Sequence, residues 1–247
     1  RDCLLSRGLG DVYKRQHQSR GQGYRNVVLI PASAHGTNPA SAAMAGMKIV
    51  TVACDERGNI DVADLEAKAK EHSSELCGLM VTYPSTHGVF ESRIREIVDA
   101  VHDAGGQVYM DGANMNAQVG LTNPGYIGAD GCHLNLHKTF ATPHGGGGPG
   151  SGAVGCKNIL KPFLPSPTVV GEEGALRLEQ DNPQSIGAVK AFYGNFLVVV
   201  RALTYLMTLG KEGVPEASSN AVLNCNYMMN HLKDVYDIAF DLSLIHI

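Results

Sequence analysis

The stretch HLNLHKTFATPHGGGGPG, residues 133–150, places one lysine, Lys138, between two histidines and ahead of four consecutive glycines. A dense glycine run costs backbone entropy, so it is typical of places where another group approaches the backbone closely. Such a lysine suits Schiff-base chemistry, which needs the neutral amine and therefore a partly desolvated side chain. Taken alone, the same stretch is also consistent with a solvated lysine followed by a mobile hairpin.

Other polar side chains follow apolar runs that are typical of buried strands. His35, Thr86 and Asp111 each lie in a segment that comes directly after such a run. The carboxyl ends of parallel strands share one edge, where ligands of such sheets bind, so we expect these side chains to converge with Lys138. Each has a structural explanation when taken alone: a hydrogen-bonding histidine, a turn hydroxyl and a cap for the following turn.

A lysine and a distant aspartate at one edge of a sheet suit pyridoxal phosphate chemistry. The lysine condenses with the cofactor aldehyde, and a carboxylate keeps the pyridine nitrogen protonated so that the ring accepts electrons from the substrate. Ala113 follows Asp111 by two residues, so both would face the same side if the extended geometry persists. A small residue there would leave room for a flat ring, and His35 would stack on its other face.

Competing kinds of site fit the sequence less well. His133 and His137 have the spacing of a helical zinc site, but the segment is predicted to be a strand and no third ligand lies beside it, so we expect no metal site. The glycine run matches neither the dinucleotide fingerprint nor the P-loop. The chain contains no G-x-S-x-G elbow that would supply a serine nucleophile.

The elements that must position these residues follow from the hydrophobic pattern. Short apolar runs alternate with amphipathic segments, which predicts a mostly parallel α/β sheet with helices on both faces. We expect Asn38 and Asp61 to cap two of the helices, and Gly105 with Gly106 to end another. Strands are predicted at 26–31, 47–55, 77–84, 106–111, 131–137 and 152–157, and helices at 38–46, 61–72, 90–106, 185–210 and 215–232.

Composition narrows the class of protein further. The chain has 247 residues, 44% of them hydrophobic and 18% charged, and a net charge of −4, so nothing favours binding to nucleic acid. No apolar run reaches the roughly 18 residues of a membrane span, so we expect a soluble protein. Six cysteines without a C-x-x-C pair indicate reduced thiols in a reducing compartment.

Five segments are long and together very specific: IPASAHGTNPASAAMAGMKIV, VTYPSTHGVFE, GQVYMDGANMNAQVG, GADGCHLNLHKTF and PHGGGGPG. They resemble the P protein of the glycine cleavage system, the pyridoxal-phosphate-dependent glycine dehydrogenase (decarboxylating). The resemblance extends from His17 to Phe240. The stretch DNPQSIGAVKAFYGNFLVVVRALTY resembles subunit 2 of the two-subunit bacterial form more than the long single-chain form.

The resemblance implies a role for each matching residue. Lys138 matches the lysine that carries the cofactor, and Asp111 the aspartate facing the pyridine nitrogen in an aspartate-aminotransferase-like large domain of fold type I. Ala113 matches the small residue against the ring, and His35 the histidine stacked on it. The remaining matches are a hydroxyl near the cofactor's phenolic oxygen or the substrate, and two neighbours of the aspartate and lysine: Thr86, Asn114 and His137.

The activity and partners also follow from the resemblance alone. The family removes CO2 from glycine and passes the aminomethyl group to the lipoyl arm of the H protein. Expected partners are subunit 1 and a second copy of the chain, and the expected location is the cytoplasm in bacteria or the mitochondrial matrix in eukaryotes. Two alternatives stay open: another lysine-linked enzyme, such as an aminotransferase or cysteine desulfurase, and a non-catalytic scaffold subunit. A scaffold subunit would be expected to lack the lysine.

The chain departs from the family pattern at three places. Ala141 stands where the family usually has a cysteine. Residues 1–16 stand where a phosphate-binding helix is expected, and we expect them and residues 241–247 to be foreign to a fragment of the family protein. We therefore expect a cofactor-binding α/β domain at 17–165, and a helical continuation toward a truncated subdomain at 166–240.

Overall fold

The computed structural model describes residues 2–144, 150–189, 194–238 and 240, and contains a six-stranded mixed sheet. The strand order is β2-β1-β3-β4-β5-β6, and every neighbouring pair is parallel except β5 with β6. All six predicted strands are therefore present. Their bounds are β1 Val27–Pro31, β2 Lys48–Val52, β3 Leu76–Thr82, β4 Gln107–Asp111, β5 Gly131–Asn135 and β6 Gly152–Cys156.

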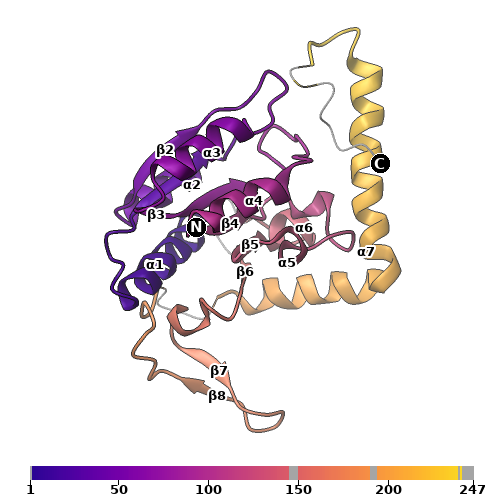
Figure 1. The fold of residues 1–247 in the computed structure, drawn as a ribbon. Helices are drawn as coiled ribbons and strands as arrows, with labels where there is room; N and C mark the ends of the chain where they lie inside the picture. Colours follow the sequence, from indigo (N-terminus) through magenta and orange to yellow (C-terminus); the bar gives the residue numbers. More distant parts are fainter. Residues whose placement is uncertain (1, 145–149, 190–193, 239, 241–247) are drawn as a thin grey trace.

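Helices surround the sheet, and a small two-stranded sheet lies apart from it (Figure 1). None of the helices in the described residues combines the length and apolar character of a membrane span. The remaining elements are α1 Asp2–Ser19, α2 Thr37–Met44, α3 Val62–Glu71, α4 Ile94–Asp103, η1 Met115–Ala117, α5 Pro124–Ile127, α6 Leu136–Thr139, η3 Lys161–Phe163, β7 Thr168–Val170, β8 Arg177–Glu179 and α7 Phe196–Leu232.

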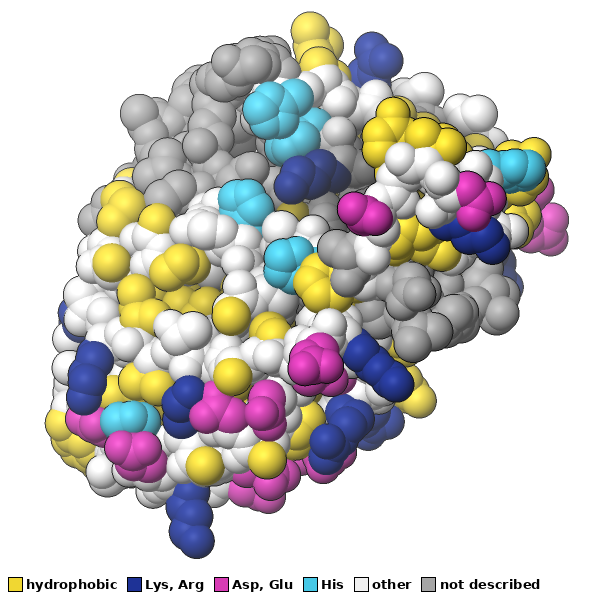
Figure 2. Space-filling view, turned by 90° about the horizontal axis from the view of Figure 1, so that it is seen from above, with side chains coloured by type: hydrophobic (Ala, Val, Ile, Leu, Met, Phe, Trp, Pro, Cys, Tyr) yellow, Lys and Arg dark blue, Asp and Glu magenta, His cyan; other side chains and the backbone are white. Residues whose placement is uncertain are grey.

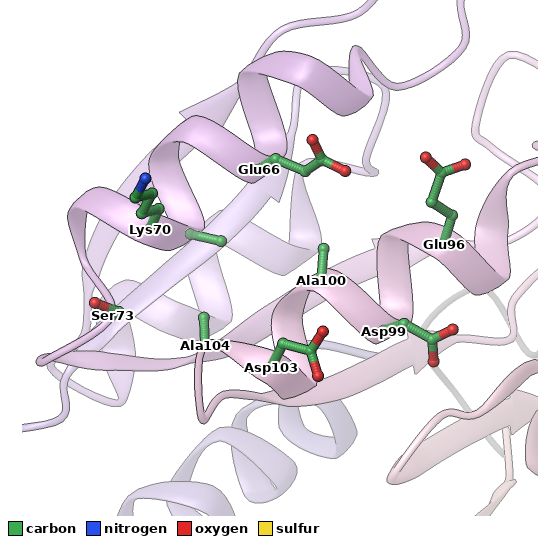
Figure 3. Close-up of a pocket in the computed structure, with 9 residues that line it drawn as sticks. Glu66, Lys70, Ser73, Glu96, Asp99, Ala100, Asp103 and Ala104 are labelled. Atoms are coloured by element: carbon green, nitrogen blue, oxygen red, sulfur yellow. The ribbon is translucent and has the colours of Figure 1, made fainter.

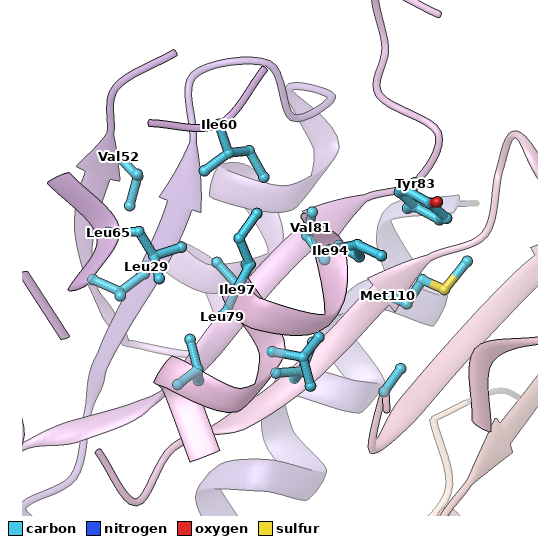
Figure 4. Packing of buried hydrophobic residues seen from close by; sticks show 14 of the residues in the cluster. Leu29, Val52, Ile60, Leu65, Leu79, Val81, Tyr83, Ile94, Ile97 and Met110 are labelled. Carbon is cyan, nitrogen blue, oxygen red and sulfur yellow. The ribbon is translucent and has the colours of Figure 1, made fainter. Parts of the chain in front are cut away.

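The central strands β1, β3, β4 and β5 bury side chains on both faces, because successive side chains point to opposite sides of a sheet. One face packs against α3 and α4 through residues such as Leu29, Leu79 and Met110, with Leu65 and Ile97 from the helices (Figure 4). The other face packs against α1, α2 and η3 through a second set: Val28, Ile30, Met80 and Tyr109 from the strands, with Val12, Tyr13, Ala42 and Phe163 opposite. The expected placement of helices on both faces is therefore confirmed.

The helix α1 runs across the boundary expected between residues 16 and 17. Within it, Val12, Tyr13 and Gln16 are buried, and the Tyr13 hydroxyl donates to the Val108 carbonyl oxygen at 3.3 Å. In this chain the residues before His17 thus contribute to the second core. The division of the chain into domains stays a prediction.

Of the two residues expected to cap helices, one does so and the other does not. Asp61 caps α3 by accepting from the Asp64 N–H, as predicted. The prediction for Asn38 is wrong: α2 begins at Thr37 with Gly36 as its cap, and Asn38 lies inside the helix. The reason is tertiary, because the Asn38 amide donates across the core to the Thr82 hydroxyl at 3.1 Å.

The two long helices expected near the carboxyl end are joined into α7. Gly210 interrupts them with non-helical dihedrals (φ 63°, ψ −166°), which a residue without a Cβ tolerates, and the two limbs run in different directions (Figure 1). The helix begins at Phe196, not at Ser185 as predicted. Ser185 instead holds its segment to the residue that follows η3, since its hydroxyl donates to the Leu164 carbonyl oxygen at 2.6 Å.

A cluster of charged and hydrogen-bonding side chains lies at the amino-terminal edge of the sheet, just before β5. The buried Asp130 carboxylate accepts from the Val108 N–H at 2.7 Å, from His102 Nε2 at 2.7 Å and from Lys157 Nζ at 2.8 Å. Burial by itself raises the pKa of this carboxyl, but the hydrogen bonds from His102, Lys157 and Val108 outweigh it and leave the pKa below its ordinary value. Asp130 therefore has a structural role.

Replacement of Asp130 by asparagine is expected to lower the free energy of unfolding by roughly 1.5–3 kcal/mol at neutral pH, the value of a hydrogen bond to a charged group. Because the folded pKa is depressed, this stabilisation is present above the unfolded pKa of about 3.9 and is lost as pH falls through the folded pKa. Urea melts at several pH values should show the difference between Asp130→Asn and wild type narrowing in acid. Asp103→Asn, which alters an exposed carboxylate on α4, is the control. Equal melts at neutral pH would contradict the role.

Candidate functional site at the carboxyl edge of the sheet

A row of three polar side chains crosses the carboxyl ends of β3, β4 and β5. The strand register pairs Thr82 with Asp111 and Asp111 with His133. Because laterally paired residues in a sheet share a face, these side chains lie side by side. They are 4%, 3% and 2% exposed, respectively, so the row is buried and its polar atoms need hydrogen-bond partners within the protein.

Asp111 sits in the middle of the row and is surrounded by donors. Its Oδ1 accepts from the Ala113 N–H at 3.0 Å, and its Oδ2 accepts from the Thr82 hydroxyl at 3.2 Å. His133 Nε2 lies 3.6 Å from Oδ1, a distance of electrostatic contact that exceeds a hydrogen bond. An ionised carboxylate offers about four acceptor positions, so capacity for a further donor remains.

The Thr82 hydroxyl has its proton direction fixed by its neighbours. It accepts from the Asn38 amide at 3.1 Å and from the His35 N–H at 3.2 Å. A hydroxyl has two acceptor lone pairs and one proton. With both lone pairs engaged, the proton must point to Asp111, so the loop after β1 and the start of α2 together orient the aspartate.

Ala113 reaches Asp111 by a different geometry from the one predicted. The strand β4 ends at Asp111, and the chain turns so that the Ala113 N–H returns to the aspartate's own side chain. The extended geometry therefore does not persist, because the aspartate side chain competes for the backbone as in an Asx turn. Asp111 thus also has the capping role that was its structural alternative.

The loops that carry His35, Thr86 and Asn114 come together at this edge. The Thr86 N–H donates to the Ser33 carbonyl oxygen at 3.4 Å, which joins the loop after β3 to the loop after β1. The Asn114 amide donates to Pro84 and Ser85 at 3.0 and 3.1 Å, which joins the loops after β4 and β3. The rings and hydroxyls do not all converge: His35 is exposed, with Nδ1 accepting from the Thr37 N–H, and Thr86 is exposed.

Lys138 lies on the one-turn helix α6, which begins where β5 ends. Its side chain is exposed, so the partial desolvation expected for a Schiff-base lysine does not come from the described residues. The helix itself is anchored, because Leu136 and Phe140 pack against Val198 and Ala202 of α7. The structure thus places the lysine at the same edge as the row, on a fixed support.

The histidines that flank the lysine have separate environments. The predicted strand ends at Asn135, so His137 belongs to α6, and its ring meets His144 edge-on at 4.5 Å. His133 instead contacts Tyr109 and Asp111. In the described part of the chain, no group of His, Cys, Asp or Glu side chains could hold a metal ion. The glycine run, residues 145–148, lies outside the described residues.

Histidine side chains gather near the middle of the molecule when it is seen from above, next to a lysine or arginine (Figure 2).

A separate groove of about 620 Å3 lies between α3 and α4, with Glu66 and Glu96 rising from the two helices (Figure 3). None of the predicted site residues lines this groove. Its lining residues, three of them alanines, are Glu66, Ala69, Lys70, Ser73, Glu96, Asp99, Ala100, Asp103 and Ala104. The groove is therefore distinct from the edge where the chemistry is expected.

Sequence reasoning missed three members of the site: Thr82, Tyr109 and His133. For Tyr109 the sequence does offer a signal: it precedes Asp111 by two residues on a predicted strand and therefore shares its face of β4. The roles of Thr82 and His133 depend on the register between strands, which the sequence pattern does not specify. His133 was considered only as a metal ligand.

Gly112 controls how closely β5 approaches the aspartate. A Cβ at this position would lie 2.3 Å from the His133 carbonyl oxygen, which the Gly112 N–H contacts at 3.0 Å. Gly112→Ala should therefore destabilise the chain by about 1–3 kcal/mol, as overpacking does, measured by thermal or urea melts. Gly155→Ala, at an exposed position of β6 with open space around it, should change stability by less than about 0.5 kcal/mol. Equal effects of the two substitutions would contradict the close approach.

Comparison with known proteins adds family evidence to this geometry. A family model of the glycine cleavage system P-protein matches residues 39–243. Glycine dehydrogenase (decarboxylating) of Proteus mirabilis is 56% identical over 228 residues, covering 92% of this chain and 23% of the relative. The mitochondrial protein of Pisum sativum is 56% identical over 230 residues, 93% of this chain and 22% of the relative.

A shorter relative is the probable glycine dehydrogenase (decarboxylating) subunit 2 of Treponema denticola. It is 52% identical over 235 residues, 95% of this chain and 48% of the relative. The chain thus spans about half the length of this protein and under a quarter of the two longer ones.

Solved structures share the fold. An inhibitor-bound glycine decarboxylase (P-protein) of the glycine cleavage system aligns with a TM-score of 0.67 at 22% identity, over 93% of this chain and 52% of that one. Mouse CSAD aligns with 0.67 at 16% identity, over 97% and 53%. The predicted fold, a mostly parallel mixed sheet with helices on both faces, is confirmed and is shared with these structures. With a family model matching residues 39–243 and relatives above 50% identity, the chain belongs to the glycine cleavage system P-protein family.

Proposed function

We propose that this chain is the cofactor-binding part of a glycine-decarboxylating enzyme that uses pyridoxal 5′-phosphate and passes the aminomethyl group to the lipoyl arm of H protein. One observation carries the proposal. A buried aspartate, Asp111, is oriented by donors at the carboxyl edge of the sheet, and Lys138 lies on a fixed helix at that same edge. The relatives named glycine dehydrogenase (decarboxylating) support the choice of reaction.

The residues present fit this cofactor. Asp111 retains acceptor capacity for a pyridinium N–H, and the small Ala113 lies beside it. Two buried side-chain oxygens, Asn38 Oδ1 and Thr139 Oγ1, have no hydrogen-bond partner within the described residues. Asn38 donates to the Thr82 hydroxyl, which in turn donates to Asp111, and Thr139 is next to Lys138 in the chain. Unpaired buried polar atoms at these places are consistent with a site completed by a polar ligand.

Each residue then has a task. When bound, the cofactor supplies an electron sink for the bond that breaks at the substrate carbon. Lys138 holds it covalently through its amine, and Asp111 holds the proton on the pyridine nitrogen. Thr82 fixes the carboxylate by donating to Oδ2, and so keeps the charge where that proton is needed.

The other proposed contacts come from the loops at the edge. His35 would stack on the ring, and Thr86 would supply a hydroxyl near the phenolic oxygen or the substrate. Asn114 ties two of these loops together by donating to the carbonyls of Pro84 and Ser85. His137 lies on the lysine helix next to Lys138, and its ring meets the ring of His144 edge-on.

Two alternatives predict different reactions for the same site. An aminotransferase or cysteine desulfurase would share the lysine and the aspartate, and a cysteine desulfurase of Thermococcus onnurineus aligns with a TM-score of 0.61 at 17% identity, over 94% of this chain and 56% of that one. A scaffold subunit would keep the fold without the chemistry, and the presence of Lys138 counts against it. Glycine-dependent exchange of CO2 with a lipoylated carrier separates the first proposal from both.

Because the side chain of Lys138 is exposed, we propose that further protein surface completes the site. We propose subunit 1 and a second copy of this chain as that surface, this chain having the subunit 2 role. Apolar side chains on the first limb of α7 support an association, since four of them are more than half exposed: Phe196, Leu197, Leu203 and Met207. The proposed location is the cytoplasm in a bacterium or the mitochondrial matrix in a eukaryote.

Covalent attachment of the cofactor is expected at Lys138. The protein mixed with pyridoxal phosphate should develop a visible absorbance band, and borohydride reduction should fix the cofactor mass on the peptide that contains Lys138. Lys138→Ala should lose both signals. Lys161→Ala, at an exposed lysine of η3 outside the site, should keep them.

The same experiment with the intact parent protein excludes an effect of chain length. Cofactor fixed on a lysine other than Lys138, or no lysine-dependent band in either protein, would overturn the cofactor proposal.

Association with partner chains is expected to accompany activity. In sedimentation experiments, this chain should co-sediment with subunit 1 as a complex that contains two copies of each, and glycine-dependent CO2 exchange should appear only with the complex. Leu197→Asp with Met207→Asp should weaken the complex, because charge on an apolar contact surface opposes its burial. A well-folded monomer with full activity would contradict this expectation.

A further inference from the structure

We propose that Tyr109 and His133 form a buried positioning pair that directs one imidazole N–H at Asp111 and so fixes the orientation and charge of that carboxylate. The inference deepens the proposed function, because it depends on Asp111 as the group that faces the cofactor. It concerns two residues to which neither the sequence pattern nor the resemblance assigns a role toward the cofactor.

The strand geometry brings the three side chains together. Tyr109 precedes Asp111 by two residues on β4, so both point to the same face, and His133 is the lateral neighbour of Asp111 on β5. The Tyr109 and His133 rings stack with centroids 5.8 Å apart and planes 11° apart. Their exposed fractions are 0% and 2%, so water does not compete for their polar atoms.

The contacts select one tautomer of the imidazole. The Tyr109 hydroxyl contacts His133 Nδ1, and His133 Nε2 faces Asp111 Oδ1 at 3.6 Å. A neutral imidazole carries one N–H and one acceptor nitrogen. If the proton were on Nδ1, the lone pair of Nε2 would face a carboxylate oxygen, and two buried acceptors in contact are unfavourable. The hydroxyl therefore donates to Nδ1, and Nε2 carries the proton toward Asp111.

Two other ionisable side chains near this face are neutral near pH 7, whereas the Asp111 carboxylate is in contact with the His133 ring. Tyr13 from α1 and Cys77 from β3 belong to the same core as Tyr109. Burial raises the pKa of the Tyr13 hydroxyl well above its ordinary value and raises the pKa of the Cys77 thiol to about 12. Both are neutral near pH 7. Cys132, the residue before His133, points to the other face of β5, where burial raises the pKa of its thiol to about 12.

The pair complements Thr82 on the opposite side of the aspartate. Thr82 donates to Oδ2. The His133 N–H points to Oδ1, which also accepts from the Ala113 N–H. The separation of 3.6 Å makes the histidine an electrostatic neighbour and does not use up a lone pair of the carboxylate. His133 and Tyr109 therefore act through Asp111 and do not themselves touch a cofactor.

The first test reads the tautomer directly, without cofactor and without activity. Two-bond ¹H–¹⁵N spectra of the chain with ¹⁵N-labelled histidine distinguish a protonated Nε2 from a protonated Nδ1, and the His133 signals are assigned by their loss in His133→Gln. We expect Nε2–H in wild type, and a mixture of tautomers in Tyr109→Phe, which keeps the ring but removes the hydroxyl. A protonated Nδ1 in wild type, or an unchanged pattern in Tyr109→Phe, would overturn the proposal.

The second test measures the consequence for Asp111. Titration with pyridoxal phosphate, followed by absorbance, should show about tenfold weaker binding for Tyr109→Phe and for His133→Gln, the value of one contact to a charged group. In the double variant Asp111→Asn with Tyr109→Phe, the hydroxyl should have no further effect, because the pair acts through the aspartate. His231→Gln, at an exposed histidine of α7, is the control.

The outcomes separate this inference from the proposed function. If wild type binds no pyridoxal phosphate, the proposed function fails, while the tautomer measurement still decides whether the pair is aligned on Asp111. If wild type binds the cofactor and Tyr109→Phe binds equally well, the positioning role is wrong. Should His133→Gln fail to fold, Tyr109→Phe, which preserves the ring stack, decides the question.

Discussion

The site depends on the parallel register of β3, β4 and β5. That register sets Thr82, Asp111 and His133 side by side at the carboxyl edge, where their buried polar atoms need partners from the protein. The close approach of Gly112 to the His133 carbonyl maintains it, since a Cβ there would push β5 away. A shift of one residue would turn Asp111 toward the opposite core, where the leucines and valines of α3 and α4 leave no donors for it.

Two aspartates at opposite edges of the sheet show how position decides the role of a carboxylate. Asp130, at the start of β5, takes a backbone N–H, a histidine and a lysine, and these partners use its charge for stability. Asp111, at the end of β4, takes a backbone N–H and a hydroxyl and keeps acceptor capacity. In a parallel sheet, a carboxylate at the carboxyl edge faces loops that can admit a ligand.

The lysine helix links the sheet to the last third of the described chain. Leu136 and Phe140 pack on Val198 and Ala202, and Arg201 Nε donates to the Ala141 carbonyl oxygen at 3.0 Å. Ala141 needs that support, because its φ of 51° is costly for a residue with a Cβ. The position of α6, the helix that carries Lys138, is therefore set by α7 as well as by β5.

The sequence by itself determined the six strands of the main sheet, the helices α2, α3, α4 and α7, the capping role of Asp61 and the edge at which the polar residues gather, because these follow from local apolar periodicity and from turn residues. It also carried the family resemblance, which the comparisons confirm. It did not indicate the small sheet of β7 and β8. The sequence pattern did not place Asn38 inside α2, turn the chain back at Ala113, or join His133 and Tyr109 to Asp111. Those features depend on hydrogen bonds between strands and loops far apart in the chain. Only the tertiary structure decided them, because the register that aligns such partners is set by the packing of whole strands.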